Sequence, residues 1–427
     1  MVVKPVSELA EVTIRSMASN GSGVGKLPDG RVVFVPRTAP GDLVRVRVSA
    51  VKRRWANGHV DEVLQPSEGR TDPPCPLYER CGGCSLQHLP YTEQLKWKGR
   101  FVVDALSRIG RLEVDEVAVT ASPKPLRYRN KITFTLKRLS GGRVVAGFHH
   151  LRRSNYVVDI KDECILPEPE LSSAWTSLRE NWGANAARLP AGGRLRLTLR
   201  NSKSGVYLFV QGGRSPWNAE NLVNRVPSVS TVWHHPSDSE EIELVHGRPH
   251  EDVWGGNRVM LIGDAFLQVN RGAAQLLEEY VKVRAGFPDT AIDAYCGIGQ
   301  YGRTLANLGT RVVGIDVSAA ALASPFVRDD ENYQTVQGTV EEHISDYLPT
   351  DLLVLNPPRS GLEHSVPVQI LAAPPKRVIY ISCDAATLAR DLYRLAPVYS
   401  LVEHRAFDFF PQTAHIETVM ILKRSGN

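Results

Sequence analysis

Short alternating runs of apolar and polar residues occupy the first 70 residues of the chain. The clearest runs are 11–15, 31–35 and 43–48. Turn-forming residues separate them, such as Asn20-Gly21 and Asp29-Gly30. Alternation with a period of two is typical of strands with one buried face, and Gly after Asn or Asp favours a tight turn. The pattern predicts a small OB-like β-barrel over residues 1–70.

The pattern is less regular between residues 71 and 255. A linker rich in proline and charge leads into this region, and a segment with helical periodicity follows at 91–109. Strand-like runs then alternate with glycine-containing turns, for example at 131–136 and 194–200. We expect a mostly β central domain that helps to shape a substrate groove.

From residue 256 the chain alternates strongly apolar runs with helical stretches. The apolar runs are 290–295, 312–316, 352–356 and 378–382. Strands of this kind, separated by helices, are the signature of a doubly wound parallel sheet. Residues 256–427 are therefore predicted to form an α/β domain with a Rossmann-like fold.

The composition, with 42% apolar and 23% charged residues, is that of a globular protein, and 427 residues suffice for two or three domains. No apolar run reaches the roughly 18–20 residues that cross a membrane. The N-terminus lacks the basic segment and apolar core of a secretory signal. We therefore expect a cytoplasmic monomer without a membrane partner.

Basic residues are concentrated in the front of the chain. Residues 1–170 contain 27 Lys and Arg against 19 Asp and Glu, whereas the remainder contains 24 against 27. Arg45 and Arg47 share one face of a predicted strand, and Lys-Arg-Arg-Trp follows at 52–55. Cations beside an aromatic ring on a barrel suit single-stranded RNA, although each of them also fits a solvated strand. The distribution indicates a polyanion-binding front half and a catalytic back half.

Three of the six cysteines have the spacing Cys75-x5-Cys81-x2-Cys84, and Cys164 follows far downstream. Four thiolates can hold either zinc or an iron–sulfur cluster. Zinc ribbons usually have two Cys-x-x-Cys pairs, whereas this chain has one, which favours a [4Fe–4S] cluster. The nearby His88 is interpreted as a packing or surface residue.

A glycine-rich turn follows the first apolar run of the C-terminal domain. Its glycines, Gly297, Gly299 and Gly302, allow a tight turn and the close approach of a ligand. Asp316 ends the next strand, where a carboxylate can accept hydrogen bonds from both hydroxyls of a ribose. These features fit a dinucleotide as well as S-adenosylmethionine.

The third strand distinguishes between these two ligands. It ends in Asn356-Pro357-Pro358-Arg359, and the prolines make the loop rigid where the fold binds its ligand. A dehydrogenase has no need of such a loop, whereas a methyltransferase uses one to hold its substrate beside the sulfonium. Methyl transfer is thus favoured over hydride transfer.

Cys383 ends the next strand, and a helix begins directly after it. A helix N-terminus lowers the pKa of a thiol, and the thiolate is the nucleophilic form. Carbon 5 of uracil becomes nucleophilic only after a thiolate adds to carbon 6, and a base must later remove the proton from carbon 5. Glu417 is the best candidate base and His415 the second choice. A buried structural cysteine and a surface carboxylate are the simpler readings of Cys383 and Glu417.

Taken together, these residues resemble the bacterial RNA (uracil-5-)-methyltransferase family over nearly the full chain. Residues 8–67 look like a TRAM domain, and Phe-Leu-Gln-Val-Asn at 266–270 looks like the family's Phe-x-Gln-x-Asn segment. The other matching pieces are the four cysteines, the block 293–302, Asp316, 356–359, Cys383 and 410–417.

The resemblance implies Cys383 as the nucleophile, Glu417 as the base, and a target uridine that is flipped out of its RNA structure. The ligands that it implies for the [4Fe–4S] cluster are Cys75, Cys81, Cys84 and Cys164. The positions that it implies for the S-adenosylmethionine pocket are Gln268, Tyr295, Gln300, Asp316 and Asn356. A TRAM-like domain together with the four cysteines resembles the branch that methylates 23S ribosomal RNA more than the transfer RNA branch.

The chain departs from the family at position 356, where Asp is usual and this chain has Asn. Asn-Pro-Pro also occurs in methyltransferases that act on exocyclic nitrogens, which need no nucleophilic cysteine. That activity stays as an alternative, together with an iron–sulfur oxidoreductase that uses nicotinamide and a non-catalytic RNA-binding protein. The proline loop has no purpose in the oxidoreductase, and Cys383 and Glu417 have none in the binding protein.

Overall fold

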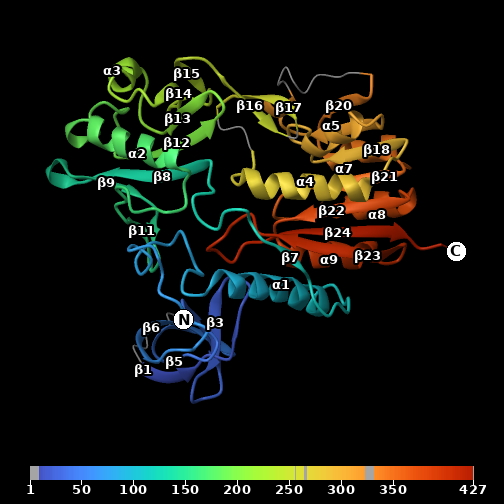
Figure 1. Cartoon of the computed structure of the whole chain (residues 1–427), viewed down its shortest axis with the longest axis horizontal. Coiled ribbons are helices and arrows are strands. Elements are labelled where there is room, and N and C mark those ends of the chain that lie inside the picture. Colours follow the sequence, from blue (N-terminus) through green and yellow to red (C-terminus); the bar gives the residue numbers. More distant parts are fainter. Residues whose placement is uncertain (1–8, 255, 264–266, 323–330, 427) are drawn as a thin grey trace.

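The computed structural model describes residues 9–254, 256–263, 267–322 and 331–426. Within this part the chain forms a small barrel, a central β-rich region and a large α/β layer (Figure 1). The long helix α1 (Tyr91–Arg108) lies between the barrel and the α/β layer. None of the described helices is both long and apolar enough to span a membrane.

The barrel is a six-stranded sheet with the order β1-β5-β6-β4-β3-β2. Its strands are β1 (Leu9–Thr13), β2 (Ser16–Met17), β3 (Ser22–Lys26), β4 (Val32–Pro36), β5 (Leu43–Val51) and β6 (Trp55–Gln65). Alternate residues point inward, so that Val33, Val35, Val44 and Val46 are fully buried. This one-sided burial explains the alternating sequence and confirms the predicted N-terminal barrel.

The central region is built on a second six-stranded sheet with the order β15-β14-β13-β12-β8-β9. Its elements are β8 (Lys131–Arg138), β9 (Val144–Gly147), β12 (Arg194–Ser202), β13 (Gly205–Gln211), β14 (Val229–His235), β15 (Glu243–His246), α2 (Pro169–Asn181), α3 (Ala219–Val223) and two 3-10 turns (Ser140–Gly142, Ala184–Ala186). Two separate hairpins pair β10 (His149–His150) with β11 (Arg153–Val157) and β16 (His250–Trp254) with β17 (Asn257–Leu261). Trp175 of α2 packs on Phe134 of β8 with ring centres 4.5 Å apart, so the helix covers one face of the sheet.

The α/β layer contains an eight-stranded sheet with the order β20-β19-β18-β21-β22-β24-β23-β7. Its strands from the C-terminal part are β18 (Thr290–Ala294), β19 (Arg311–Asp316), β20 (Tyr333–Gln337), β21 (Leu352–Leu355), β22 (Arg377–Ser382), β23 (Tyr399–Phe407) and β24 (Glu417–Arg424). Its helices are α4 (Arg271–Ala285), α5 (Gln300–Ala306), α6 (Ala319–Leu322), α7 (Val340–Tyr347), α8 (Ser365–Ala372) and α9 (Ala385–Leu395). Strands β18 to β22 pair in parallel and β24 pairs with β22 in the opposite sense, as a doubly wound fold requires.

The core of this layer lies on both faces of the sheet. Ile379 and Ile381 of β22 belong to one buried cluster, whereas Val378 and Tyr380 belong to the cluster on the other face. Two-sided burial is the reason why these strands read as continuous apolar runs and not as alternating ones. The four strands predicted from those runs are confirmed to within one residue at each end.

One strand of the sheet comes from far upstream. Strand β7 (Val119–Thr120) pairs with Ala406 and Phe407 at the outer edge of β23. The chain between the barrel and the central sheet thus contributes to the α/β layer. The predicted boundaries of the three domains, at residues 70 and 255, stay predictions.

Candidate active site

Cys383 and Glu417 lie at the ends of two neighbouring strands. Ser382, the last residue of β22, pairs with Thr418 of β24. Cys383 directly follows Ser382 and Glu417 directly precedes Thr418, so both lie where this antiparallel ladder ends. Cys383 is half-buried and Glu417 is only 4% exposed. Cys383 and Glu417 are more than thirty residues apart in the sequence, and the fold therefore brings them together at one edge of the sheet.

The charge state of both groups depends on burial and on Arg359. Burial raises the pKa of Glu417 to about 8, and the Arg359 guanidinium opposes this rise. Burial also raises the pKa of the Cys383 thiol, as does the charge of Glu417, and Arg359 again acts in the opposite direction. Helix α9 does begin directly after Cys383, with the Asp384 side chain accepting hydrogen bonds from Ala386 and Thr387. Burial and Glu417 thus raise the pKa of this thiol, in the direction opposite to the one predicted from the helix N-terminus.

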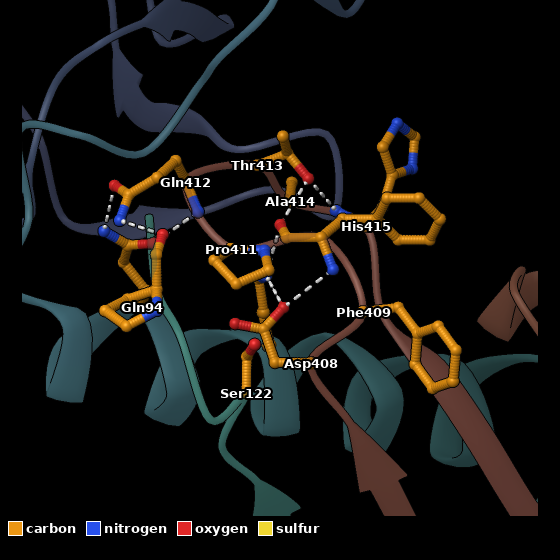
Figure 2. A network of polar contacts seen from close by, with 12 residues as sticks. Gln94, Ser122, Asp408, Phe409, Pro411, Gln412, Thr413, Ala414 and His415 are labelled. Atoms are coloured by element: carbon orange, nitrogen blue, oxygen red, sulfur yellow. Dashed lines mark hydrogen bonds and ion pairs between the residues drawn. The ribbon is translucent and has the colours of Figure 1, made fainter. Parts of the chain in front are cut away.

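His415 belongs to the loop that precedes Glu417. Its ring packs edge-on against Phe410, with ring centres 5.9 Å apart, and it points away from the polar network that holds the loop (Figure 2). Burial lowers the pKa of His415, and Arg359 lowers it further. The imidazole is thus kept neutral in the positive field that Arg359 contributes to this edge of the sheet.

Helix α1 fixes the loop 408–415 by buried polar contacts (Figure 2). Gln94 Nε2 donates to Gln412 Oε1, and the Gln412 backbone N–H donates to Gln94 Oε1, both at 3.0 Å. Lys98 Nζ donates to Asp408 Oδ1 at 2.6 Å and to the Phe410 carbonyl at 3.0 Å. These contacts hold the loop that leads into β24, whose first residue is Glu417.

The glycine-rich turn follows β18 at the same edge of the sheet. Gly297 has a φ of 56° and its amide donates to Asp316 Oδ2 at 2.7 Å, which fixes the turn against the end of β19. A Cβ atom on Gly302 would lie 2.6 Å from the Tyr333 ring and 2.8 Å from Asp293 Oδ2, so only glycine fits at this position. Burial raises the pKa of Asp293 to about 7. The turn leaves backbone exposed to a ligand, as a nucleoside cofactor requires.

Four of the five predicted S-adenosylmethionine pocket residues, Tyr295, Gln300, Asp316 and Asn356, lie in or beside this turn. Tyr295 has a positive φ of 61° within the turn itself, and the Asn356 amide donates to the Ala294 carbonyl at 3.3 Å. Asp316 also accepts a 2.8 Å hydrogen bond from the Ser318 amide, so its carboxylate is partly engaged by the protein. The Gln300 side chain donates to Glu278 at 3.2 Å. Phe266, part of the predicted Phe-x-Gln-x-Asn segment, lies outside the described residues.

The segment that carries Gln268 is held by the central region. The Asn130 side chain donates through Nδ2 to the Gln268 backbone carbonyl at 3.1 Å. The Asn130 backbone N–H donates to the Val269 backbone carbonyl at 2.9 Å. The fully buried Arg200 donates to the Leu267 carbonyl at 3.2 Å. Three successive carbonyls of one segment are therefore bound by β8 and β12 or their flanking residues.

The four predicted metal ligands line one cavity. Cys75, Cys81, Cys84 and Cys164 surround it together with apolar residues such as Phe148. All four are free thiols, and within the described residues no group of three or more His, Cys, Asp or Glu is placed so that it could hold a metal ion. His88 is buried and pairs with the Tyr78 hydroxyl at 2.8 Å, which makes it a packing residue.

Two arginines flank the cysteine cavity. Burial raises the pKa of Cys84 to about 12 and of Cys164 to about 11, and Arg129 opposes both rises. Burial likewise raises the pKa of Cys75 and Cys81, and there Arg37 is the opposing cation. Each thiol thus lies in the field of one guanidinium, which favours an anionic occupant.

The basic strand face of the barrel is largely neutralised. Arg45 contacts Glu62 at 2.5 Å, and Arg47 contacts Asp61 at 2.7 Å. Both arginines are half-exposed, but their charges are balanced by carboxylates on β6. The sequence correctly places them on one face, yet it gives no sign of these partners.

Comparison with known proteins identifies the family. A TRAM domain model matches residues 6–60, and a model described as tRNA (Uracil-5-)-methyltransferase matches residues 327–425. An uncharacterized RNA methyltransferase of Thermosynechococcus vestitus is 34% identical, over 97% of this chain and 98% of its own. One of Halalkalibacterium halodurans is 31% identical, over 98% and 97%. The chain belongs to the RNA (uracil-5-)-methyltransferase family.

A solved structure supports this membership over almost the whole molecule. The Pyrococcus abyssi tRNA (uracil-54, C5)-methyltransferase in complex with S-adenosyl-L-homocysteine has a TM-score of 0.74 and 25% identity, over 97% of this chain and 99% of that one. The predicted fold class and enzyme class are confirmed. Both the nicotinamide-dependent oxidoreductase and the non-catalytic binding protein are excluded, and S-adenosylmethionine is the methyl donor expected of this fold.

Two residues that shape the site of this methyltransferase, Arg359 and Lys98, are not predicted to do so from the sequence. Arg359 enters there only as part of the Asn-Pro-Pro-Arg loop, although it influences both Cys383 and Glu417. A cation directly after the proline loop was the available signal. Lys98 gave none, because its partner is 310 residues away in the sequence.

Proposed function

We propose that this RNA methyltransferase transfers a methyl group from S-adenosylmethionine to carbon 5 of one uridine in 23S ribosomal RNA. The observation that supports it best is the pairing of a nucleophile and a base. Cys383 directly follows β22, Glu417 is the first residue of the neighbouring strand β24, and Arg359 acts electrostatically on both. Neither a simple thiol nor a lone carboxylate would need this arrangement.

The proposed reaction begins at the Cys383 sulfur. The thiolate adds to carbon 6 of the flipped uracil, and the electron pair of the carbon 5–carbon 6 double bond shifts toward carbon 5 and the carbonyl at carbon 4. Carbon 5 takes up the methyl group that bound S-adenosylmethionine would supply, and the methyl–sulfur bond breaks to leave S-adenosylhomocysteine. Glu417 then removes the proton from carbon 5, the double bond re-forms and the Cys383 sulfur leaves.

The residues around these two groups have separate tasks in this proposal. Arg359 stabilises the thiolate before attack and the Glu417 carboxylate before proton removal, since it lowers the pKa of each. The predicted binding residues for the methyl donor are Gln268, Tyr295, Gln300, Asp316 and Asn356. The Gly297 turn and Asp316 fit a nucleoside, because exposed backbone and a carboxylate adjoin each other there.

A [4Fe–4S] cluster is the proposed occupant of the cysteine cavity. Four thiols around one apolar cavity match its ligand number, and the two flanking arginines complement the net negative charge of a four-thiolate cluster. In a [4Fe–4S] cluster each cysteine sulfur binds a different iron atom, so the four cysteine sulfurs lie further apart than they would around a single metal ion. We infer a structural role, because the cavity joins residues 75–84 to the segment around Cys164.

Ribosomal RNA is the proposed substrate, because the TRAM domain and the four cysteines occur together in this chain. Transfer RNA is the second candidate, and the similarity to the Pyrococcus abyssi transfer RNA enzyme favours it. Methylation of an exocyclic nitrogen is a weaker alternative that rests on Asn356 alone. We infer that the protein acts in the cytoplasm, where its RNA is made.

The decisive experiment is mass spectrometric mapping of 5-methyluridine in ribosomal and transfer RNA from cells with and without the gene. We expect one ribosomal 5-methyluridine to disappear, and to return with the wild-type gene but not with Cys383→Ala. His415→Gln serves as the control and should restore the mark. Loss of a transfer RNA mark would replace the substrate but keep the reaction. No change in any 5-methyluridine would contradict the proposal.

The cluster has its own test, which does not depend on methyl transfer. Protein purified without oxygen should contain iron and acid-labile sulfide in equal amounts and show a broad absorbance in the visible range. Cys164→Ser should lower both contents, whereas Cys296→Ser, at a cysteine outside the cavity, should not. Zinc without sulfide would contradict the proposed cluster.

A further inference from the structure

A small hairpin of the central region carries an exposed aromatic ring among cations. Strands β10 and β11 form it, and Tyr156 near its end is 62% exposed. Arg153 Cζ lies 5.8 Å from the centre of the Tyr156 ring. Single exposed aromatic rings are common on protein surfaces, so the charges around Tyr156 decide whether this ring indicates a binding site.

The surface beside the hairpin is positively charged. A hollow there is lined by Arg80, His150, Arg153, Tyr156 and Lys161, with Asp159 as its carboxylate. Arg179 of α2 neutralises that carboxylate through hydrogen bonds of 2.8 and 3.1 Å. The cations of the hollow, in contrast, have no carboxylate at ion-pair distance among the described residues.

One further observation shows how far this positive surface extends. On the other side of the hairpin, Arg152 lines a groove against the barrel and donates to the Val60 carbonyl at 3.3 Å. Figure 1 shows β11 between the central sheet and the barrel. The unbalanced charge therefore lies on the hairpin, and not on the barrel face whose arginines are paired.

The hairpin is anchored to the segment that also anchors the active-site loop. The Gly82 amide donates to the His149 carbonyl at 2.9 Å, and the Leu151 amide donates to the Arg80 carbonyl at 2.8 Å. Three residues beyond Gly82, the Ser85 amide donates to the Gln412 carbonyl at 2.9 Å. Chain geometry limits the span from residue 82 to 85 to about 11 Å. A ligand on the hairpin is therefore bound by the framework that positions Glu417.

We propose that the hairpin 149–157, with Arg80 and Lys161, is a stacking platform for an unpaired nucleotide of the RNA substrate. Tyr156 takes the face of the base, and Arg80 and Arg153 take the neighbouring phosphates. Stacking on an aromatic ring suits any base, and the cations supply the sequence-independent attraction to the backbone. The inference rests on the RNA methyltransferase function, but not on which atom of the target base is methylated.

The test is equilibrium binding of a fluorescent oligouridylate to the full-length protein without S-adenosylmethionine. Tyr156→Ala should raise the dissociation constant by about 5- to 150-fold, the range measured for loss of base stacking. Tyr156→Phe keeps the ring and should bind as wild type. Arg153→Gln should lower the slope of log affinity against log salt concentration by about 0.7, as loss of one phosphate contact does for a single strand.

The chain offers a matched control on another surface. Tyr393 of α9 is 48% exposed, and Arg111 Cζ lies 5.1 Å from its ring centre. Tyr393→Ala should therefore leave oligouridylate binding unchanged. If Tyr156→Ala binds as tightly as Tyr393→Ala, the platform is contradicted. Displacement of the oligouridylate by polyglutamate, or equal sensitivity of a poly(A)·poly(U) duplex to Tyr156→Ala, would also overturn it in favour of another partner.

The outcome can be separated from that of the proposed function. Binding is measured without the methyl donor and in a protein whose Cys383 is intact, so it does not depend on turnover. A protein that forms no 5-methyluridine but loses oligouridylate affinity with Tyr156→Ala would keep the platform and discard the reaction. If the protein forms 5-methyluridine but Tyr156→Ala binds oligouridylate as tightly as wild type, the reaction is kept and the platform is discarded.

Discussion

Lys98 of α1 and Asp408 after β23 form an ion pair of 2.6 Å in which both side chains are 0% exposed. The pair joins two segments that are 310 residues apart and lies at the start of the loop 408–415, which precedes Glu417 (Figure 2 shows Asp408). A buried charge without its partner is costly, whereas an apolar pair of similar volume is often tolerated. We expect Lys98→Met to lower the free energy of unfolding by about 3–5 kcal/mol, measured by urea denaturation.

The double variant is the control for this pair. Lys98→Met with Asp408→Leu removes both charges and should recover most of the lost stability. Methyl transfer by the double variant should stay reduced, because the Phe410 carbonyl loses its hydrogen bond to Lys98. A double variant as unstable as Lys98→Met would show that Asp408 is not the group that Lys98 compensates.

The rate of methyl transfer should rise with pH across the neutral range. Burial raises the pKa of Glu417 to about 8, and burial and Glu417 raise that of Cys383. Both groups act in their deprotonated forms, so each gains activity as the pH increases. We expect kcat/KM to increase steeply up to about pH 8, where Glu417 becomes ionised, and to go on increasing more gradually above it, because the raised pKa of Cys383 leaves that thiol only partly ionised there. A rate that is flat between pH 6 and 8, measured by transfer of radiolabelled methyl groups, would contradict these roles.

Glu417→Gln separates the two chemical steps. The amide has no basic oxygen, so the proton on carbon 5 should stay in place after methyl transfer. We expect a stable covalent complex between this variant and its methylated RNA, visible as a shifted band on a denaturing gel. Cys383→Ala should form no such complex. Normal turnover by Glu417→Gln together with loss of activity in His415→Gln would make His415 the base.

Stability should depend on pH through the same carboxyl group. Its pKa is about 8 in the folded protein, against 4.5 as the ordinary value, so the folded state binds this proton more tightly. The stabilising contribution is complete below about pH 4.5 and is lost as the pH rises through 8. Each unit of pKa difference corresponds to about 1.4 kcal/mol. Glu417→Gln should therefore gain stability over wild type by a few kcal/mol between pH 5 and 9, measured by urea denaturation at each pH. An unchanged difference would mean that Glu417 is ionised throughout.

Much of the framework could be predicted from local pattern. The strands that end near Asp316, Asn356 and Cys383 are buried on both faces, so their apolar runs stand out, and a parallel sheet gathers their carboxyl ends. Partners that are remote in sequence could not be predicted in this way. Nothing in the pattern pairs Arg47 with Asp61 or Arg200 with Leu267, because hydrogen-bonding residues at such distances leave no periodic signal.

The remote contacts of Asn130 lead to a prediction about the methyl donor. Its side chain donates to the Gln268 carbonyl at 3.1 Å, and Gln268 is a predicted residue of the S-adenosylmethionine pocket. In Asn130→Ala the backbone N–H of residue 130 still donates to the Val269 carbonyl, so the segment that carries Gln268 should stay in place but lose one hydrogen bond. Loss of one hydrogen bond is worth about 0.5–1.5 kcal/mol, which corresponds to a roughly 2- to 13-fold weaker affinity. We expect this loss for S-adenosylhomocysteine in isothermal titration calorimetry.

A merely structural role for Asn130 predicts a different result. General destabilisation would weaken oligouridylate binding as well and would lower kcat, whereas a positioning role should raise the KM for S-adenosylmethionine and leave kcat nearly unchanged. Thr133→Val is a suitable control, because it removes a 2.8 Å side-chain hydrogen bond to Thr198 within the same sheet without touching the Gln268 segment. Equal losses of cofactor affinity in Asn130→Ala and Thr133→Val would assign Asn130 to the sheet and not to the pocket. A loss confined to Asn130→Ala would mean that the central region, which also carries the hairpin 149–157, takes part in binding the methyl donor.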